Sequence, residues 1–249
     1  MNVVIVGQVP FVDEIGRLCR LAGHDEAIYL TEEFAVAGDR AERLAAADVA
    51  IELQDASAAA KRALLGALGA GLPPEALLLT SALASSATAA AAAVVRPERV
   101  VGFGVLPPVP ETGLVEVAAA LQTGDEALAR AEWFWRGLGQ EPLRVADGPG
   151  LVRARTVCCL INAAAGLLLE GVATAADIDL AMRLGTNYPH GPLAWADRIG
   201  LDVVLGVMTG LFEEWGEDRY RPSPLLRRLV AAGRLGQKTG RGFYPYPED

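Results

Sequence analysis

The residues best suited to bind a phosphate lie at the start of the sequence. Gly7 ends the apolar run Asn2–Gly7 and precedes an amphipathic stretch, Phe11–Leu21. A glycine between a strand and a helix allows a tight turn, and the free N–H groups of the helix N-terminus attract an anion. The dinucleotide fingerprint needs three glycines, and the window Gly7–Val12 keeps only the first. Val9 places a branched side chain where a pyrophosphate would lie, so we favour a retained scaffold over tight dinucleotide binding.

Groups that could move a proton near neutral pH are scarce. The sequence has two histidines, His24 and His190, and both lie in turn-like segments. We interpret them as structural or surface residues rather than as bases. Arg153 and Arg155 open a long helical stretch. Their planar guanidinium groups could hold a carboxylate or phosphate through two hydrogen bonds, and a simple surface pair is as reasonable.

The chain divides into two regions that differ in their predicted secondary structure. Up to residue 149, strand-like runs alternate with helical stretches, which predicts a parallel sheet covered by helices, a Rossmann-like α/β domain. The sequence DGPG at 147–150 marks a boundary, after which helical stretches dominate, so we expect domains at 1–149 and 150–249. Thr174 and Asp177 have the spacing of a capping box at the start of a helix. Gly171 is a residue typical of a helix C-terminus. The helices expected in the second domain are Leu151–Gly171, Ala175–Leu184, Leu193–Ile199, Leu201–Trp215 and Leu225–Gly233.

Composition narrows the classes of function. Hydrophobic residues make up 52% and charged residues 21% of the 249 residues, which is typical of a folded domain. Residues 1–149 hold 20 acidic and 11 basic residues, and this acidic surface argues against a nucleic-acid partner. We expect no membrane span and no signal peptide, and therefore a cytoplasmic protein. With three cysteines and two histidines in no cluster, no metal site is expected.

The second domain resembles the C-terminal domain of the 3-hydroxyacyl-CoA dehydrogenases. The matching residues are EGVATAADIDLAMRLGTNYPHGPLAWADRIGLD (Glu170–Asp202) and YRPSPLLRRLVAAGRLGQKTGRGFYPY (Tyr220–Tyr246). The first domain is similar to the family's NAD domain through RPERVVGFGVLPPVPETGLVEV (Arg96–Val117) and IEL…KRALL (Ile51–Leu65). Within Glu170–Asp202, the sequence NYPHGPLAWA (187–196) most resembles the second module of the long 3-hydroxyacyl-CoA dehydrogenases of phenylacetate breakdown. The resemblance implies oxidation of a 3-hydroxyacyl-CoA with NAD, and a homodimer formed through the helical domain.

The resemblance also implies where catalysis would occur. In the family a His, oriented by a Glu, removes the hydroxyl proton, helped by a Ser and an Asn. The Glu is retained as Glu116, but the His position is Gly104, and the Asn of the same loop is replaced by Pro107. The Asn of the helical domain aligns with Ala154, beside Arg155.

Several substrate and cofactor positions follow from the same resemblance. The family's Ser aligns with Leu83, although Ser81 and Ser85 lie close enough to line the substrate cleft with Arg153 and Arg155. Glu52 and Lys61 match positions that face the nicotinamide or the substrate, and with Gly7 they form the expected cofactor contacts. The plain alternative for Glu52 and Lys61 is a strand-end carboxylate and a solvated helix lysine.

Two further departures bear on function. Leu30 replaces the acidic residue that holds the ribose, and only Thr31–Ala47 separates two strands between which the family projects a helical arm toward coenzyme A. Our first hypothesis is therefore a weakly active or non-catalytic member, a pseudoenzyme that binds or assembles in acyl-CoA metabolism. The alternatives are an active NAD-dependent dehydrogenase with a rearranged site, and an enzyme of another class centred on Glu116 or Arg155. Trp133 and Trp135 cannot both face inward on one helix, so one of them is left to contact a partner.

Overall fold

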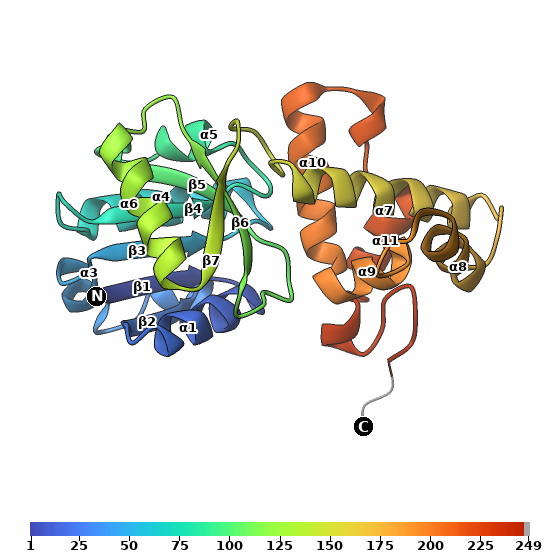
Figure 1. The fold of residues 1–249 in the computed structure, drawn as a ribbon, viewed down its shortest axis with the longest axis horizontal. Coiled ribbons are helices and arrows are strands. Elements are labelled where there is room, and N and C mark those ends of the chain that lie inside the picture. The colour runs from blue at the N-terminus through green and yellow to red at the C-terminus, as the bar shows by residue number, and fades with distance from the viewer. Residues whose placement is uncertain (247–249) are drawn as a thin grey trace. The chain divides into compact units, whose positions relative to one another are not determined.

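The computed structural model describes residues 1–246 and divides the chain into two compact units, one of residues 1–152 and one that starts at Arg153. The first unit is built on a seven-stranded sheet with the order β2-β1-β3-β4-β5-β6-β7 (Figure 1). Neighbouring strands are parallel except that β6 runs antiparallel to β5. The strands are β1 (Asn2–Gly7), β2 (Asp25–Leu30), β3 (Val49–Leu53), β4 (Leu77–Ser81), β5 (Val100–Gly104), β6 (Gly113–Ala119) and β7 (Gln140–Arg144).

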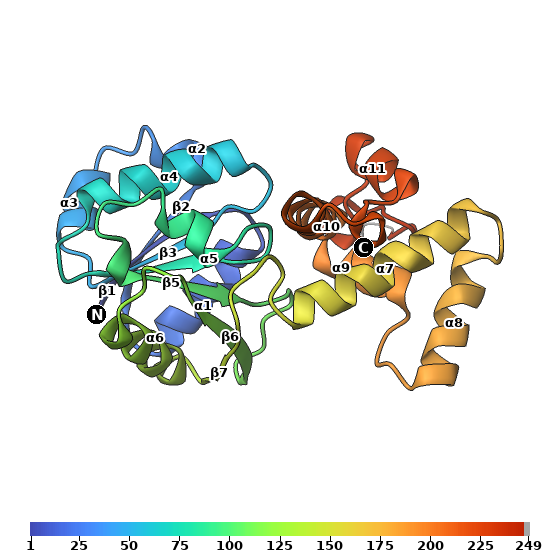
Figure 2. The ribbon, with the colours of Figure 1, turned by 90° about the horizontal axis from the view of Figure 1, so that it is seen from above.

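Helices cover both faces of this sheet (Figure 2). The central strands β3, β4 and β5 are buried along their whole length, which explains why they read as continuous apolar runs. Gly16 of α1 (Phe11–Leu21) faces Ile28 of β2 so closely that a Cβ there would collide with the isoleucine side chain. One face carries α2 (Thr31–Phe34), α3 (Arg40–Ala45), α4 (Ala58–Gly71) and α5 (Ala87–Ala91), and the other α1 (Phe11–Leu21) and α6 (Asp125–Gly137).

The chain order of the strands reverses direction beside β1. From β1 the chain moves to β2 on one side and then to β3 on the other, so Gly7 ends level with Leu30 and Leu53. In open parallel sheets, ligands bind in the crevice at the carboxyl ends of the strands at such a point. This edge is where the candidate residues of the first unit gather.

The second unit is helical, as predicted. Thr174 Oγ1 accepts a hydrogen bond from the Asp177 backbone N–H at 3.2 Å, so Thr174 caps the helix as predicted. The Asp177 carboxylate accepts from the Thr174 hydroxyl at 2.7 Å, so only the Thr174 half of a capping box is observed. Gly171 has φ +70° after the long helix, which confirms the predicted helix end. That helix begins at Arg153 and not at Leu151, because Leu151 has φ +48°, which an α-helix cannot contain. The helices are α7 (Arg153–Leu169), α8 (Ala175–Thr186), α9 (Pro192–Ile199), α10 (Leu201–Trp215) and α11 (Pro224–Ala231).

The last described segment is fastened to α8 and α9 by one buried carboxylate from each helix. Asp197 accepts hydrogen bonds from the backbone N–H groups of Phe243 and Tyr244, both at 2.9 Å, and from Tyr246 Oη at 3.1 Å. Asp179 accepts from Tyr244 Oη at 2.8 Å and from the first N–H groups of α9. The glycine-rich tail is therefore part of the packed helical unit.

Candidate functional site

Glu116 and Gly104 face each other at the carboxyl end of β5. They are directly paired in the antiparallel ladder between β5 and β6, and Glu116 is 2% exposed. A Cβ atom placed on Gly104 would lie 3.5 Å from Glu116 Oε2. Any side chain at position 104 would therefore touch this buried carboxylate.

Leu151 lies over the same position. Its Cδ1 atom would be 2.9 Å from a Cβ on Gly104, so the isobutyl group occupies the space into which such a side chain would grow. Leu151 is buried and packs with Ala82 and Ala118 in a small apolar cluster. The surroundings of Glu116 are consequently apolar on this side.

Glu52 and Lys61 form a buried ion pair at the carboxyl ends of β3 and β4. Lys61 Nζ lies 2.6 Å from Glu52 Oε2 and donates to the Ser81 carbonyl at 2.8 Å. Thr80 Oγ1 donates to the same Glu52 oxygen at 2.6 Å. Burial alone would lower the pKa of Lys61, but Glu52 and Asp55 outweigh it and hold that pKa above its ordinary value. Lys61 is 4% exposed, so the reading of a solvated helix lysine is wrong.

Asp55 extends this network to Ser81. Ser81 Oγ donates to Asp55 Oδ2 at 2.5 Å, and Asp55 Oδ1 lies 3.6 Å from Lys61 Nζ. Ser85 lies outside the network, with a buried hydroxyl, and Leu83 is buried as well. Our sequence reasoning missed Asp55 and Thr80, although polar residues at or just after the ends of two buried strands were a signal for them.

The loop after β1 has three features that bear on anion binding. A Cβ on Gly7 would collide with Leu53, so this position requires glycine. Val9 is 50% exposed, so its side chain lines the loop surface. The first turn of α1 carries two acids, Asp13 and Glu14, which oppose the positive end of the helix dipole.

Glu14 ties this helix to the loop after β5. Its Oε2 accepts the Val109 N–H at 2.7 Å, while Arg17 of the next turn lies 3.0 Å from Glu111. Burial raises the pKa of Glu14, and the Val109 N–H acts against that rise. At the end of β2, Thr31 Oγ1 donates to the Gly7 carbonyl at 3.1 Å, beside Leu30.

In the helical unit, the guanidinium group of Arg155 is held between two aromatic rings. Its central carbon lies 5.0 Å from the Trp215 ring and 5.1 Å from the Tyr220 ring, and one N–H donates to Tyr220 Oη. Arg153 starts the same helix. Asn162 Oδ1 accepts the Ser223 N–H at 2.7 Å and so anchors the start of α11.

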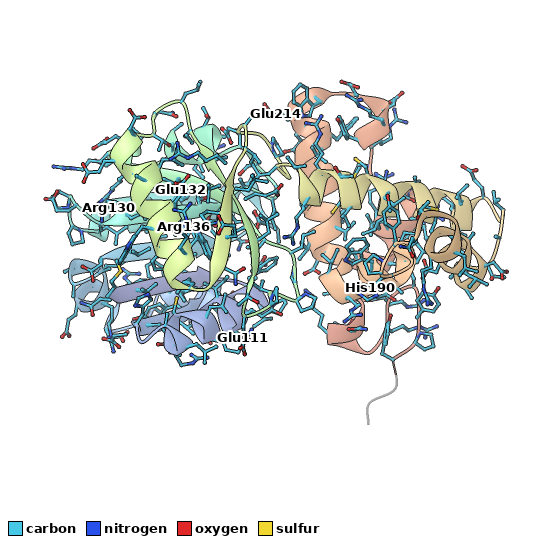
Figure 3. All side chains as sticks on the ribbon, viewed as in Figure 1. Glu111, Arg130, Glu132, Arg136, His190 and Glu214 are labelled. Carbon is cyan, nitrogen blue, oxygen red and sulfur yellow. The ribbon has the colours of Figure 1, made fainter. Side chains whose placement is uncertain are left out.

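The two histidines make aromatic and cationic contacts. His24 stacks on Phe134 with ring centroids 5.8 Å apart, and it precedes β2, at the opposite edge of the sheet from Gly104. His190 belongs to the helical unit and its Nε2 lies 3.1 Å from Arg198 Nη1 (Figure 3). Burial lowers the pKa of both imidazoles.

Residues 1–246 contain neither a clustered set of metal-ligand side chains nor a membrane-spanning helix. No group of three or more His, Cys, Asp or Glu residues is arranged to hold a metal ion within that range. No helix of the same range is both long and apolar enough to span a bilayer.

Comparison with known proteins gives matches over both units. Residues 25–148 match the 3-hydroxyacyl-CoA dehydrogenase NAD binding domain, and residues 150–246 match the 3-hydroxyacyl-CoA dehydrogenase C-terminal domain. A probable 3-hydroxybutyryl-CoA dehydrogenase of Bacillus subtilis is 41% identical over 202 residues, 81% of this chain and 70% of the relative. A 3-hydroxybutyryl-CoA dehydrogenase of Bradyrhizobium diazoefficiens is 40% identical over 85% of this chain and 72% of its own. The crystal structure of the (S)-3-hydroxybutyryl-CoA dehydrogenase of Ralstonia eutropha superposes with a TM-score of 0.80 at 33% identity, over 99% of both chains.

Proposed function

This chain belongs to the 3-hydroxyacyl-CoA dehydrogenase family, and on that premise we propose that it serves acyl-CoA metabolism as a weakly active or non-catalytic member. The ligand class is a short-chain acyl-CoA, in keeping with the names of its relatives. The observation that carries the proposal is the pairing of Glu116 with a glycine.

Without an imidazole at position 104, the proton of a 3-hydroxyl has no base beside Glu116 at the family's position. General acid–base help contributes roughly 10²–10⁴-fold to a rate, so its loss alone would leave little turnover. Leu151 supports the proposal, because it packs over Gly104.

The loop after β1 supports weak cofactor binding. Val9 and Val12 stand where the fingerprint has glycines, and Asp13 and Glu14 add negative charge where a pyrophosphate would bind. The side chain of Leu30 cannot accept a hydrogen bond from a ribose hydroxyl. The NAD-domain match starts at residue 25, after this loop. The residues present do not fit NAD as the fingerprint requires, so we derive no step through it.

The segment that contacts coenzyme A in the family is also shorter in this chain. The connection between β2 and β3 holds only two short helices, α2 and α3, of four and six residues. The family's projecting arm, which contacts coenzyme A, has no counterpart of similar length in that connection.

The alternative is an active NAD-dependent dehydrogenase that converts 3-hydroxyacyl-CoA to 3-oxoacyl-CoA with other catalytic groups. Two observations favour it. Glu116 is retained, and the Glu52–Lys61 pair keeps β3, β4 and α4 tied at the edge where a nicotinamide would lie.

We also propose that the helical unit forms a homodimer, as the family does. Its surface exposes several large apolar side chains, and where such side chains form a patch they mark interfaces. The residues are Leu167, Leu169, Val172, Leu180, Leu184 and Tyr188, each at least 39% exposed.

One experiment separates the two functions. The purified chain is titrated with NADH by calorimetry, and reduction of acetoacetyl-CoA is then assayed at saturating or 2 mM NADH. The Ralstonia eutropha enzyme serves as the positive control for both readouts.

We expect no saturable NADH binding in the micromolar range and a turnover well below the ~1–10³ s⁻¹ typical of enzymes. Micromolar NADH binding together with turnover of about 1 s⁻¹ or more would refute the proposal in favour of the active enzyme.

A further inference from the structure

A small apolar pocket lies at the edge of the sheet opposite Gly7 and Gly104. It has a volume of about 250 Å³ and is bounded by α6 and by the first residues of β3 and β4. Its deep wall consists of Val49, Leu77 and Phe134, each 1% exposed. The proposed function does not involve this pocket.

Trp133 forms one side of the pocket and is left largely in water. It is 65% exposed, whereas Trp135, two residues later on α6, is fully buried. Met1 lies on the pocket as well and is 39% exposed. An indole ring next to an apolar pocket buries more apolar area when a ligand enters, and that burial favours binding. The prediction that one of the two tryptophans faces outward is confirmed for Trp133.

A cationic group stands at the mouth of the pocket. Arg130 projects from α6 one turn before Trp133 and donates one hydrogen bond, to the Glu75 carbonyl at 2.7 Å (Figure 3). Within residues 1–246, no carboxylate forms an ion pair with this guanidinium group, so it keeps donors for an external anion. Glu126, one turn earlier, also lines the pocket and opposes an anion there.

The size of the pocket limits what fits. An apolar cavity of about 150 Å³ accommodates benzene. A pocket of about 250 Å³ therefore suits one aromatic ring or a short alkyl chain, and is too small for a helix or a whole nucleotide.

We propose that this pocket is a binding site for a small aryl or short alkyl carboxylate. The apolar part lies between Trp133, Met1 and the deep wall, and the carboxylate binds Arg130. The site is independent of Glu116, because it lies at the amino ends of the strands.

The probes that test this are 3-phenylpropanoate and hexanoate, with the matching alcohols as neutral analogues. Binding is followed in the full chain by calorimetry and by the NMR signal of the Trp133 indole N–H, assigned with Trp133→Phe. We expect submillimolar binding of one carboxylate or both, and at least a tenfold loss in Ala129→Phe, which fills the pocket.

Variants that change a charge test whether the carboxylate of the ligand binds Arg130. Arg130→Met should weaken the carboxylates about five- to tenfold and leave the alcohols unchanged, while Glu126→Gln should tighten the carboxylates. Arg136→Met is the matched control, because Arg136 lies on the same helix, pairs with Glu132 at 3.8 Å and does not line the pocket. Circular dichroism melts establish that each variant folds.

The proposal is overturned if neither carboxylate binds at 10 mM, if Ala129→Phe leaves binding intact, or if Arg136→Met has the same effect as Arg130→Met. It is also overturned if light scattering shows that Trp133→Ser removes a self-association of the chain, because the pocket would then take a second copy.

Discussion

Gly104 and Glu116 are paired directly across the antiparallel strands β5 and β6, with the carboxylate 3.5 Å from the place where a Cβ of residue 104 would be. This pairing makes position 104 the natural place to introduce a base. The nearest obstacle at this position is the buried side chain of Leu151, whose Cδ1 atom lies 2.9 Å from the Cβ position, so a larger residue there needs a shorter one at 151. The pairing also means that the carboxylate would stabilise a cation introduced there.

We therefore predict that Gly104→His, combined with Leu151→Ala, builds a histidine whose pKa lies above its ordinary value of ~6.5. The cause is the adjacent Glu116 carboxylate, which favours the imidazolium form. NMR titration of the introduced ring measures this pKa. Adding Glu116→Gln should remove the rise, and an unchanged pKa in the two backgrounds would contradict the pairing.

The same variant should gain acetoacetyl-CoA reductase activity, measured with 2 mM NADH. Acid–base help is worth up to ~10²–10⁴-fold, and if cofactor binding is as weak as we propose, the gain should lie near the lower value. Gly104→Ala with Leu151→Ala is the control that changes packing without adding a base.

The acids of the first turn of α1 should act in opposite directions on stability and on anion binding. Asp13→Asn removes a charge that the helix dipole stabilises, so we predict a loss of ~0.3–1 kcal/mol in the free energy of unfolding. NADH or inorganic pyrophosphate should bind more tightly to the same variant, because a repulsive charge has gone. Urea unfolding and calorimetry measure the two effects. Glu42→Gln on α3 is the control for anion binding, since it removes the same charge away from this helix end.

Much of this first unit could be predicted from sequence, but its buried polar network could not. The alternation of apolar runs and helical stretches is visible within short segments of the sequence. It therefore predicts the strands and the helices that cover them. The burial of Lys61 depends on Glu52, nine residues earlier, and on the Ser81 carbonyl, twenty residues later. Such partners are set by the register of β3 and β4, which no local pattern contains.

At the boundary between the units, the sequence also failed to predict the local backbone conformation. The apolar run after Gly150 predicts a helix that includes Leu151. The chain instead gives Leu151 a positive φ and uses its side chain to cover Gly104. The resemblance to the family suggested that Gly104 and Glu116 belong together, but only the antiparallel register of β5 and β6 gives their contact.

Removing Lys61 should destabilise the first unit strongly. Lys61→Met leaves Glu52 and Asp55 buried without their cation, which costs about 3–5 kcal/mol for a buried pair. Chemical denaturation followed by circular dichroism measures the loss. Adding Glu52→Gln should recover part of it, because the uncompensated charge is then removed. A loss below about 1 kcal/mol in Lys61→Met would mean that Glu52 and Asp55 are not left buried and charged in the variant.

The tail of the helical unit should loosen in alkali. Burial raises the pKa of Tyr246 to about 12, and the neighbouring Asp197 carboxylate adds to the effect. A phenol with a raised pKa in the folded state stabilises that state while it stays protonated. This stabilisation is complete below pH ~10, the ordinary value, and is lost as the pH rises toward 12. Urea midpoints at pH 8 and pH 11 should therefore differ less in Tyr246→Phe than in the parent chain, and an equal difference would contradict the linkage.

The apolar face of α8 should hold two copies of the chain together. Leu180 and Leu184 are one turn apart on this helix and are 50% and 77% exposed. They therefore form an exposed apolar surface whose burial in an interface would be favourable. Light scattering of the parent chain should give twice the monomer mass of 26.1 kDa, and Leu184→Glu should return it to the monomer mass. The matched control is Leu121→Glu, because Leu121 is 92% exposed in the first unit and should leave the dimer intact. If both variants keep the parent mass, α8 is not the interface. If the parent chain is itself a monomer at micromolar concentration, the proposed homodimer is wrong.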